Sequence, residues 1–434
     1  MGLCLPPGRH RPHGRGVDVT AAARSGALAA YAAVTAAYWA FMLTDGALRM
    51  LVLLHFDTLG FSPIQIAWLF LGYEMAGIVT NLSAGWLATR FGLTATLFAG
   101  LGIQVVALIA LTRLDPGWGV ALSVTYVILA QTLSGVAKDL TKMSSKSAVK
   151  LLAPAADGGL FRWVAVLTGS KNAVKGAGFF LGAALLALIG FRGSMWAMAI
   201  TLASILAASV AFMPPGLPRG KKGTKVGEVF AKDRRINQLS LARMFLFGAR
   251  DVWFVVGVPV YFEAVLSDGT PAGHRTAFFL VGAFMAAWVI AYGGVQAVAP
   301  RLLNAKTRQE GEIAALASRW VIGLTVIPFA LAALTLFAGA PALWLSLTLA
   351  AGLLLFGFVF AVNSSAHSYL ILAFTSAERV TMDVGFYYMS NAVGRLLGTL
   401  LSGISYQLGG LPLCLATSGL LSGLSWLAVR RLGG

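Results

Sequence analysis

Long apolar stretches separated by short polar segments recur along the chain after residue 26. Each stretch has about 20 to 25 residues, the length that a helix needs to cross the hydrocarbon core of a bilayer. A membrane barrel would instead show segments of about ten residues that alternate apolar and polar positions, and none is visible. The pattern therefore predicts an all-α integral membrane protein. Helices are expected near residues 28–54, 63–88, 94–111, 120–138, 163–189, 194–213, 239–266, 276–298, 314–337, 341–370, 383–408 and 411–429.

The composition supports a chain that folds in lipid. Of its 434 residues, 58% are hydrophobic and only 11% are charged, whereas a soluble domain carries about 25% charged residues. A basic segment with several prolines, Pro214–Gln238, separates the first six expected helices from the last six. We therefore predict twelve transmembrane helices, organised as a disordered basic extension (1–25), a six-helix half (26–213), a cytoplasmic linker (214–238) and a second six-helix half (239–434).

The distribution of positive charge predicts how the chain lies in the membrane. The net charge is +17, which in a soluble protein would suggest nucleic acid as a partner. With the N-terminus inside, however, twenty-three Lys and Arg residues fall in the inner loops and tails, and three fall in the outer loops. The inner count includes Lys138 and Lys142, assigned to the connection between the fourth and fifth helices. The positive-inside rule then predicts a multi-pass protein of the cell inner membrane with both termini cytoplasmic and no nucleic-acid partner.

Other residues that carry chemistry are sparse. The two cysteines, Cys4 and Cys414, lie at opposite ends of the chain, and the five histidines show no ligand spacing, so neither a disulfide framework nor a metal site is expected. The sequence has no phosphate-binding loop that ends in Gly-Lys-Ser/Thr. It also shows no clustered acid–base constellation of the kind that an enzyme needs. We therefore expect a permease without a cofactor.

Charged residues inside the expected helices point to a site. A charge at mid-helix costs about 2.5–3.5 kcal/mol to insert, so it persists where it faces a cavity or a partner. The cations outnumber the acids, which predicts a small anionic substrate, since Arg presents a planar fork that suits phosphate, arsenate or carboxylate. The predicted substrate-binding residues are Arg49, Lys171, Lys175, Arg250 and Arg395, and the predicted proton-coupling or ion-pair residues are Asp45, Glu74 and Asp251.

Spacing leaves some of these roles open. Asp45 and Arg49 are four residues apart and share a helix face, so they either pair with each other or leave Arg49 to the substrate. Lys171 and Lys175 have the same spacing but like charges, which favours an anion between them. Arg250 and the adjacent Asp251 point about 100° apart on a helix, so at most one is expected to face the cavity squarely.

The two halves also repeat short patterns. The interval from Asp45 to Phe56-Asp57 in the first half equals the interval from Asp251 to Phe262-Glu263 in the second. The segment Asn172–Gly176 is likewise similar to Asn391–Arg395. These matches align the first helix with the seventh and the fifth with the eleventh, as in the two six-helix repeats of the major facilitator fold. Between the second and third helices, Gly85–Gly92 resembles the gating loop of that superfamily, Gly-x-x-x-Asp-Arg-x-Gly. It carries Gly85, Arg90 and Gly92, with Thr89 in place of the Asp.

Three further strings, Tyr38–Arg49, Lys138–Lys146 and Gly248–Phe254, resemble the ArsJ-type organoarsenical efflux permeases of the major facilitators. The resemblance extends over nearly all of the chain after residue 26. It implies export of 1-arseno-3-phosphoglycerate by alternating access, and hence arsenate resistance. The functional partner would be glyceraldehyde-3-phosphate dehydrogenase, which makes that ester from arsenate. The alternatives are a permease for another organic anion, such as a sugar phosphate or carboxylate, and a membrane assembly factor.

Overall fold

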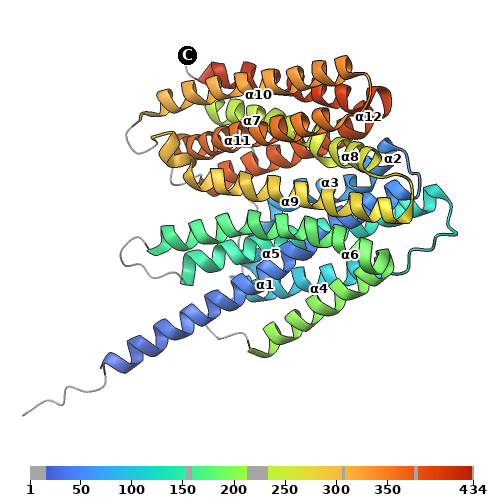
Figure 1. Ribbon diagram of the computed structural model, residues 1–434. Helices are drawn as coiled ribbons and strands as arrows, with labels where there is room; N and C mark the ends of the chain where they lie inside the picture. The colour runs from blue at the N-terminus through green and yellow to red at the C-terminus, as the bar shows by residue number, and fades with distance from the viewer. Residues whose placement is uncertain (1–15, 153–158, 213–232, 305–307, 376–379, 433–434) are drawn as a thin grey trace, which may run out of the picture.

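Helices account for the regular structure throughout the part of the chain that the computed structural model describes, residues 16–152, 159–212, 233–304, 308–375 and 380–432. Most of them run side by side across the molecule (Figure 1). In these ranges, nine helices are long and apolar enough to cross a membrane. The predicted all-α membrane architecture is confirmed.

The first half of the chain contains six elements. α2 begins with a capping box, in which the Ser62 hydroxyl accepts from the Gln65 backbone N–H and the Gln65 side chain accepts from the Ser62 N–H. The elements are α1 (Gly16–Thr58), α2 (Pro63–Leu69), α3 (Leu71–Phe91), α4 (Leu93–Leu111), α5 (Val120–Leu152) and α6 (Gly159–Phe212).

The second half repeats this arrangement with a wider turn of π-helix in its first span. That turn, Trp253–Gly257, is fully buried and joins α7 to α8. The elements are α7 (Arg234–Val252), η1 (Trp253–Gly257), α8 (Val258–Leu266), α9 (Pro271–Leu302), α10 (Glu310–Ala338), α11 (Leu343–Phe374), α12 (Val380–Val429) and η2 (Arg430–Leu432).

Two of the helices are long enough to cross the membrane twice. α6 has 54 residues, or about 80 Å at 1.5 Å per residue, against a hydrocarbon core of about 30 Å. Its backbone breaks at Gly190, and the 50-residue α12 breaks at Gly409 and Gly410. Gly190 and Gly410 have φ values of 68° and 62°, which favour glycine. With α2 and α3 joined through Phe70 as one span, the described helices make the predicted twelve crossings.

Several boundaries differ from the prediction. α1 reaches back to Gly16, through a run of alanines that the sequence analysis assigned to a disordered extension. α5 continues to Leu152, well beyond the predicted end at Lys138. α7 begins at Arg234 within the predicted linker, because the Asp233 carboxylate accepts a hydrogen bond from the Arg235 N–H and caps the helix. Residues 1–15 and 213–232, which hold most of the expected extension and linker, lie outside the described ranges.

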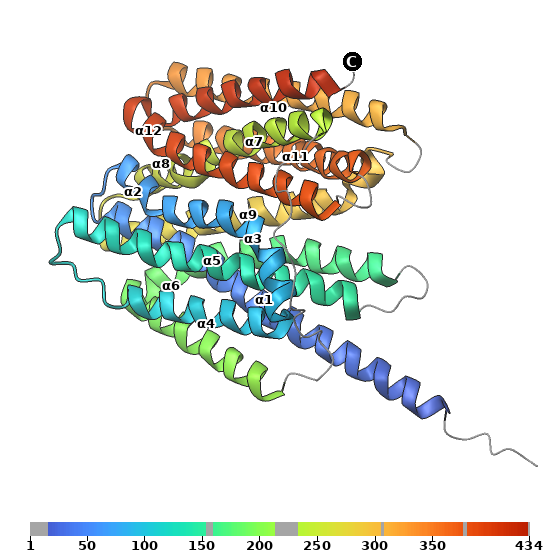
Figure 2. The same cartoon turned by 180° about the vertical axis from the view of Figure 1, so that it is seen from behind.

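In Figures 1 and 2, α1 and α4–α6 lie in the lower part of the bundle, α7 and α10–α12 lie in the upper part, and α2 and α3 lie at the level of α8 and α9 between them. α1 packs on α6 in the first half, and α7 packs on α12 in the second. At each crossing two glycines meet: a Cβ added to Gly178 would lie 3.1 Å from the Gly46 Cα, and one added to Gly398 would lie 3.0 Å from the Gly248 Cα. The halves contact each other where α6 meets α9 and where α2 and α3 meet α12.

Candidate functional site

An ion pair beside the glycine crossing of the first half holds Asp45. The Lys175 ammonium lies 2.8 Å from Asp45 Oδ2, and the Tyr73 hydroxyl donates to Asp45 Oδ1 at 2.6 Å. Asp45 is only 3% exposed, so the carboxylate exchanges water for these two donors. The predicted Asp45–Arg49 alternative is therefore wrong: the partners of Asp45 come from the neighbouring helices α6 and α3.

Glu74 on α3 joins the two halves. Its Oε1 atom lies 3.2 Å from an Arg49 NH2 nitrogen on α1 and 2.5 Å from an Arg395 NH2 nitrogen on α12. Glu74 is fully buried, and its second oxygen, Oε2, has no hydrogen-bond partner among the described residues. One carboxylate oxygen thus carries the link between a cation of the first half and a cation of the second.

Asp251 on α7 is the second-half counterpart of Asp45. The Arg250 Nε atom donates to Asp251 Oδ1 at 2.6 Å, so the arginine side chain bends back onto its own neighbour. We predicted that Arg250 and Asp251 would point apart on the helix. The arginine side chain is long enough to reach the neighbouring carboxylate despite the angle of about 100° between the two positions. Arg395 Nε lies 3.8 Å from Asp251 Oδ2, beyond hydrogen-bond distance, and has no hydrogen-bond partner within the described ranges.

A third group of charges on α5 was missed by the sequence analysis. Lys142 lies 3.2 Å from Asp139 Oδ1, and the Thr80 hydroxyl donates to Asp139 Oδ2 at 2.5 Å. The Lys138 ammonium lies 4.0 Å from Asp139 and 4.0 Å from the centre of the Tyr73 ring. The prediction that Lys138 and Lys142 belong to an inner loop is wrong, because both lie within α5, which continues to Leu152. Their helical spacing around a buried aspartate was the available signal.

These charges form one set, here named the central ion network. Six cations face four acids, so the network carries two more positive than negative charges. Lys175 and Arg395 lie about midway along the spans Gly159–Gly190 and Val380–Gly409, at a depth where an unbalanced charge is costly. The network consists of Arg49, Lys138, Lys142, Lys175, Arg250 and Arg395 with Asp45, Glu74, Asp139 and Asp251.

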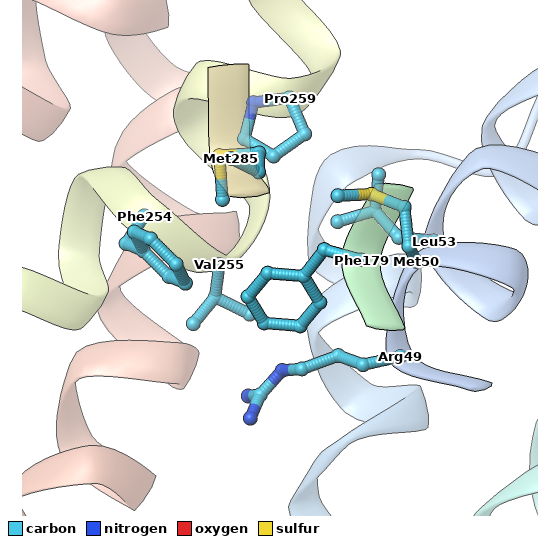
Figure 3. A pocket seen from close by; sticks show the side chains of 8 residues that line it. All are labelled: Arg49, Met50, Leu53, Phe179, Phe254, Val255, Pro259 and Met285. Carbon is cyan, nitrogen blue, oxygen red and sulfur yellow. The ribbon is translucent and has the colours of Figure 1, made fainter. Parts of the chain in front are cut away.

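A recess between the halves opens beside Arg49 (Figure 3). It is narrow and partly open to solvent, with room for about one water molecule. The rings of Phe179 and Phe254 face this space from opposite halves, and the Arg49 side chain extends along one side of it. Both halves supply its lining: Arg49, Met50, Leu53 and Phe179 from the first, and Phe254, Val255, Pro259 and Met285 from the second.

Two other predicted features are Lys171 and the gating loop. Lys171 is half-buried on α6, one turn before Lys175. In the predicted gating loop, Gly85 and Arg90 lie within α3, and Gly92 alone separates α3 from α4. Gly92 has a φ of 86°, a value that L side chains rarely adopt, so this single glycine forms the turn between α3 and α4.

Arg243, a cation inside α7, has a packing role. Its guanidinium donates to the Ser364 carbonyl and hydroxyl, both at 2.9 Å, and lies over the Phe247 ring at 4.1 Å. Backbone and side-chain groups of α11 therefore hold one nitrogen of this guanidinium outside the central ion network, whereas its buried Nε atom has no hydrogen-bond partner among the described residues. In the described ranges, no group of three His, Cys, Asp or Glu residues gathers in a way that could hold a metal ion.

Comparison with known proteins agrees with this architecture. Residues 31–317 match the family described as Major Facilitator Superfamily. The chain belongs to this superfamily. No curated protein gives a significant match to the sequence. As a major facilitator, it is a multi-pass secondary transporter of a small substrate.

Solved structures support the same fold at low sequence identity. The crystal structure of a mutant of the nucleoside transporter NupG is 16% identical, with a TM-score of 0.67 over 94% of this chain and 98% of that one. A structure of a proton-dependent oligopeptide transporter is 13% identical, with a TM-score of 0.66 over 93% and 97% of the two chains. A POT family transporter in complex with a thioalcohol-conjugated peptide is 12% identical, with a TM-score of 0.68 over 94% and 95%.

Proposed function

We propose that this transporter exports an organoarsenical phosphoester, 1-arseno-3-phosphoglycerate, by alternating access and so confers arsenate resistance. The observation that carries the proposal is the cationic excess of the central ion network. An anion that enters the site would balance it, and a substrate with two anionic ends would engage cations of both halves.

The position of the resemblance strings supports this assignment. Tyr38–Arg49, Lys138–Lys146 and Gly248–Phe254 are far apart in the sequence and lie on three different helices. Together they supply seven of the ten residues of the central ion network: Asp45, Arg49, Lys138, Asp139, Lys142, Arg250 and Asp251. These three strings therefore contribute to the proposed binding site.

The contacts of Glu74 indicate how substrate could act on the halves. Glu74 holds Arg49 and Arg395 across the interface. A substrate anion would compete with this carboxylate for the same guanidinium groups, because both offer charged oxygens as acceptors. Binding would weaken the Glu74–Arg395 link and let the halves move, with Lys171, Lys175 and Arg250 as further cations along the path. Asp45 and Glu74 are the candidates for proton exchange in this cycle.

Selectivity follows from the chemistry of the ester. A site for arsenate alone could not easily reject phosphate, because the two oxyanions have nearly the same charge and hydrogen-bonding needs. An ester with a second anionic group can be recognised by the spacing between its charges. Glyceraldehyde-3-phosphate dehydrogenase would then be a metabolic partner that supplies the substrate without binding to the transporter.

The test is growth in arsenate of an efflux-deficient host that carries this gene, with and without the dehydrogenase. We expect resistance to arsenate only with the dehydrogenase, and none to arsenite, which is neutral near pH 7. Equal arsenate resistance in both hosts would reject the ester and favour direct oxyanion export. Accumulation of a sugar phosphate or carboxylate, but not of arsenic, in everted vesicles would favour a permease for another organic anion.

The proposed orientation in the inner membrane has its own test. The start of α1 and the end of α12 lie at the same end of the bundle in both views (Figures 1 and 2), as an even number of spans requires. The excess of basic residues in the inner connections makes this end the cytoplasmic one. Reporter fusions at Gly434 and after Gly269 should report opposite sides. Periplasmic activity at Gly434 would overturn the orientation.

A further inference from the structure

The rings of Phe179 on α6 and Phe254 on η1 meet between the two halves. Their centroids lie 6.0 Å apart, and the two residues are only 2% and 8% exposed. Both rings line the recess beside Arg49 (Figure 3), which has room for about one water molecule. Because a small organic anion is much larger than a water molecule, it passes this point only when the two rings separate.

The two rings lie on the side of the central ion network away from the chain termini. Phe179 follows Lys175 by four residues, and Phe254 follows Arg250 by four residues, which is about one helical turn. Both helices run here from the end of the bundle that holds the termini toward the opposite end, which the proposed orientation makes the outer one. The rings therefore stand between the ion network and the outer end of the bundle.

Cations of the network lie close to the same two rings. The Lys175 ammonium lies 6.0 Å from the centre of the Phe179 ring, and the central carbon of the Arg250 guanidinium lies 5.7 Å from the centre of the Phe254 ring. A cation within about 6 Å of a ring face is attracted to it. The position of each ring is thus coupled to a cation that the substrate is proposed to engage.

Phe254 belongs to the π-helical turn Trp253–Gly257, where the helix is least regular. The Val258 N–H donates to the Trp253 carbonyl, five residues back, whereas an α-helix uses the carbonyl four residues back. Pro259 follows, and it has no N–H with which to extend the ladder of backbone hydrogen bonds. A wide turn followed directly by proline is a point at which a helix can bend.

A side chain of the neighbouring helix α12 holds this turn. Ser402 is fully buried, and its hydroxyl accepts hydrogen bonds from the N–H groups of Val256 and Gly257 at 3.1 and 3.3 Å. These two backbone donors thus have an acceptor outside their own helix, which satisfies them in a buried site. Loss of these two bonds would free the turn to change its winding, and the Phe254 ring would move with it.

We infer that Phe179 and Phe254 form an outer gate, and that the π-helical turn Trp253–Gly257 is the hinge on which the Phe254 ring withdraws. The gate is closed in this conformation. It requires a transporter of a small substrate, but it does not depend on which anion is carried. Ser402 sets how readily the hinge moves.

The experiment measures how fast a thiol reagent reaches the ion network from outside the cell. Ala392→Cys supplies the thiol, in a chain whose Cys4 and Cys414 are replaced by alanine. Ala392 is 5% exposed, and its Cβ lies 3.9 Å from a Cβ added to Gly77 of the first half, beside the network. Intact cells are treated with an anionic methanethiosulfonate that does not cross the bilayer. The labelling rate then reports how often the path past the two rings is open, and the assay needs no transported substrate.

The ring variants test the gate. Phe179→Ala and Phe254→Ala should each raise the labelling rate about tenfold, since each removes an aromatic contact between the halves. Phe337→Ala is the control, because this ring is 91% exposed on α10, and it should leave the rate unchanged. Phe179→Leu and Phe254→Leu, which keep apolar bulk, replace any alanine variant that does not reach the membrane. Labelling of the ring variants at the rate of Phe337→Ala overturns the gate.

Ser402→Ala tests the hinge. It removes the hydroxyl that holds the two N–H groups of the turn, and it should raise the labelling rate several-fold. Ser425→Ala is the matched control: Ser425 is also buried on α12, but its hydroxyl donates to the Ala242 carbonyl of α7 at 2.8 Å, outside the π-helical turn. Labelling of Ser402→Ala that is no faster than that of Ser425→Ala overturns the hinge.

The outcomes keep the gate and the organoarsenical function apart. Faster labelling of the ring variants, together with no arsenate resistance in the host that carries the dehydrogenase, would reject the proposed substrate and leave the gate standing. Equal labelling of all variants, together with dehydrogenase-dependent resistance, would reject the gate and leave the exporter standing.

Discussion

The two halves place an acid and a cation at matching positions but engage them differently. In the first half, Lys175 lies 2.8 Å from Asp45 beside the crossing of α1 and α6. In the second, Arg395 lies 3.8 Å from Asp251 beside the crossing of α7 and α12. Lys175 and Arg395 each precede a crossing glycine, Gly178 or Gly398, by three residues. We call the Asp45–Lys175 pair closed, because its charged atoms lie within hydrogen-bond distance. We call the Asp251–Arg395 pair open, because its charged atoms lie beyond that distance.

The difference arises from where each cation finds its strongest partner. Asp45 is satisfied within its own half by Lys175 and Tyr73. Arg395 instead turns to Glu74 in the other half, and Arg250 takes its place at Asp251. The closed pair therefore stabilises one half, and the open pair leaves a cation free to link the halves. Under the proposed function, a substrate anion would compete with Glu74 for this cation.

The largest effect is expected at Arg395. Arg395→Gln removes the link to Glu74 and one of the two cations shared between halves, so we expect transport to fall by at least about a hundredfold, in line with the loss of a buried charge pair. Membrane abundance should stay near normal, because Glu74 keeps Arg49. Arg319→Gln, on the exposed face of α10, is the control. Transport within a few-fold of the wild type would refute the role of the open pair.

Glu74→Gln should come next. The substitution keeps the shape of the side chain but leaves Arg49 and Arg395 without their shared carboxylate. If Glu74 exchanges a proton during the cycle, net export against a gradient should be lost while exchange of substrate across the membrane persists. Accumulation in everted vesicles, with and without an uncoupler, measures both. Uphill export by Glu74→Gln that still collapses with the uncoupler would move proton coupling to another acid, with Asp45 the first to test.

Lys175→Gln should act mainly on stability. Breaking a buried ion pair by removal of one partner costs about 3–5 kcal/mol, because the remaining charge is left unpaired. We expect lower membrane abundance and a lower unfolding temperature, and recovery of both in the double variant Asp45→Asn/Lys175→Gln. Transport by that double variant decides whether Lys175 contacts substrate: activity within about tenfold of the wild type would assign it to structure alone.

Much of this arrangement could be predicted from sequence, because a bilayer makes charge conspicuous. An apolar stretch long enough to span the membrane is visible directly, and Asp45, Glu74 and Arg395 stand out within such stretches. Their partners could not be predicted. Spacing along one helix allowed Asp45 to pair with Arg49, but α3 and α6 bring other donors to Asp45. The link from Glu74 to Arg395 joins residues 321 positions apart in the sequence, and local patterns carry no information on it.

The α5 charges show a different limit. A helix end is hard to locate where polar residues begin, and Lys138 and Lys142 were read as loop residues for that reason. The positive-inside rule then gave a sufficient explanation for both lysines, since it treats every basic residue near a span as an orientation signal. Burial by the surrounding helices, which no local pattern encodes, distinguishes Lys138 from the basic residues of a true inner loop.

The smallest effect is expected from Tyr73→Phe, which tests how closed the Asp45–Lys175 pair is. The change removes the hydroxyl that donates to Asp45 at 2.6 Å but keeps the ring that lies under Lys138. Loss of a hydrogen bond to a charged group costs about 1.5–3 kcal/mol, and Lys175 still balances the carboxylate. We therefore expect a modestly lower unfolding temperature and transport within a few-fold of the wild type.

Thermal unfolding in detergent and vesicle transport measure these effects. Tyr73→Leu, which also removes the ring, separates the role of the hydroxyl from that of the aromatic face. A transport defect in Tyr73→Phe as large as that of Arg395→Gln would mean that the first-half pair also opens during the cycle, and the contrast between the two halves would then describe one state of the transporter and not a division of roles.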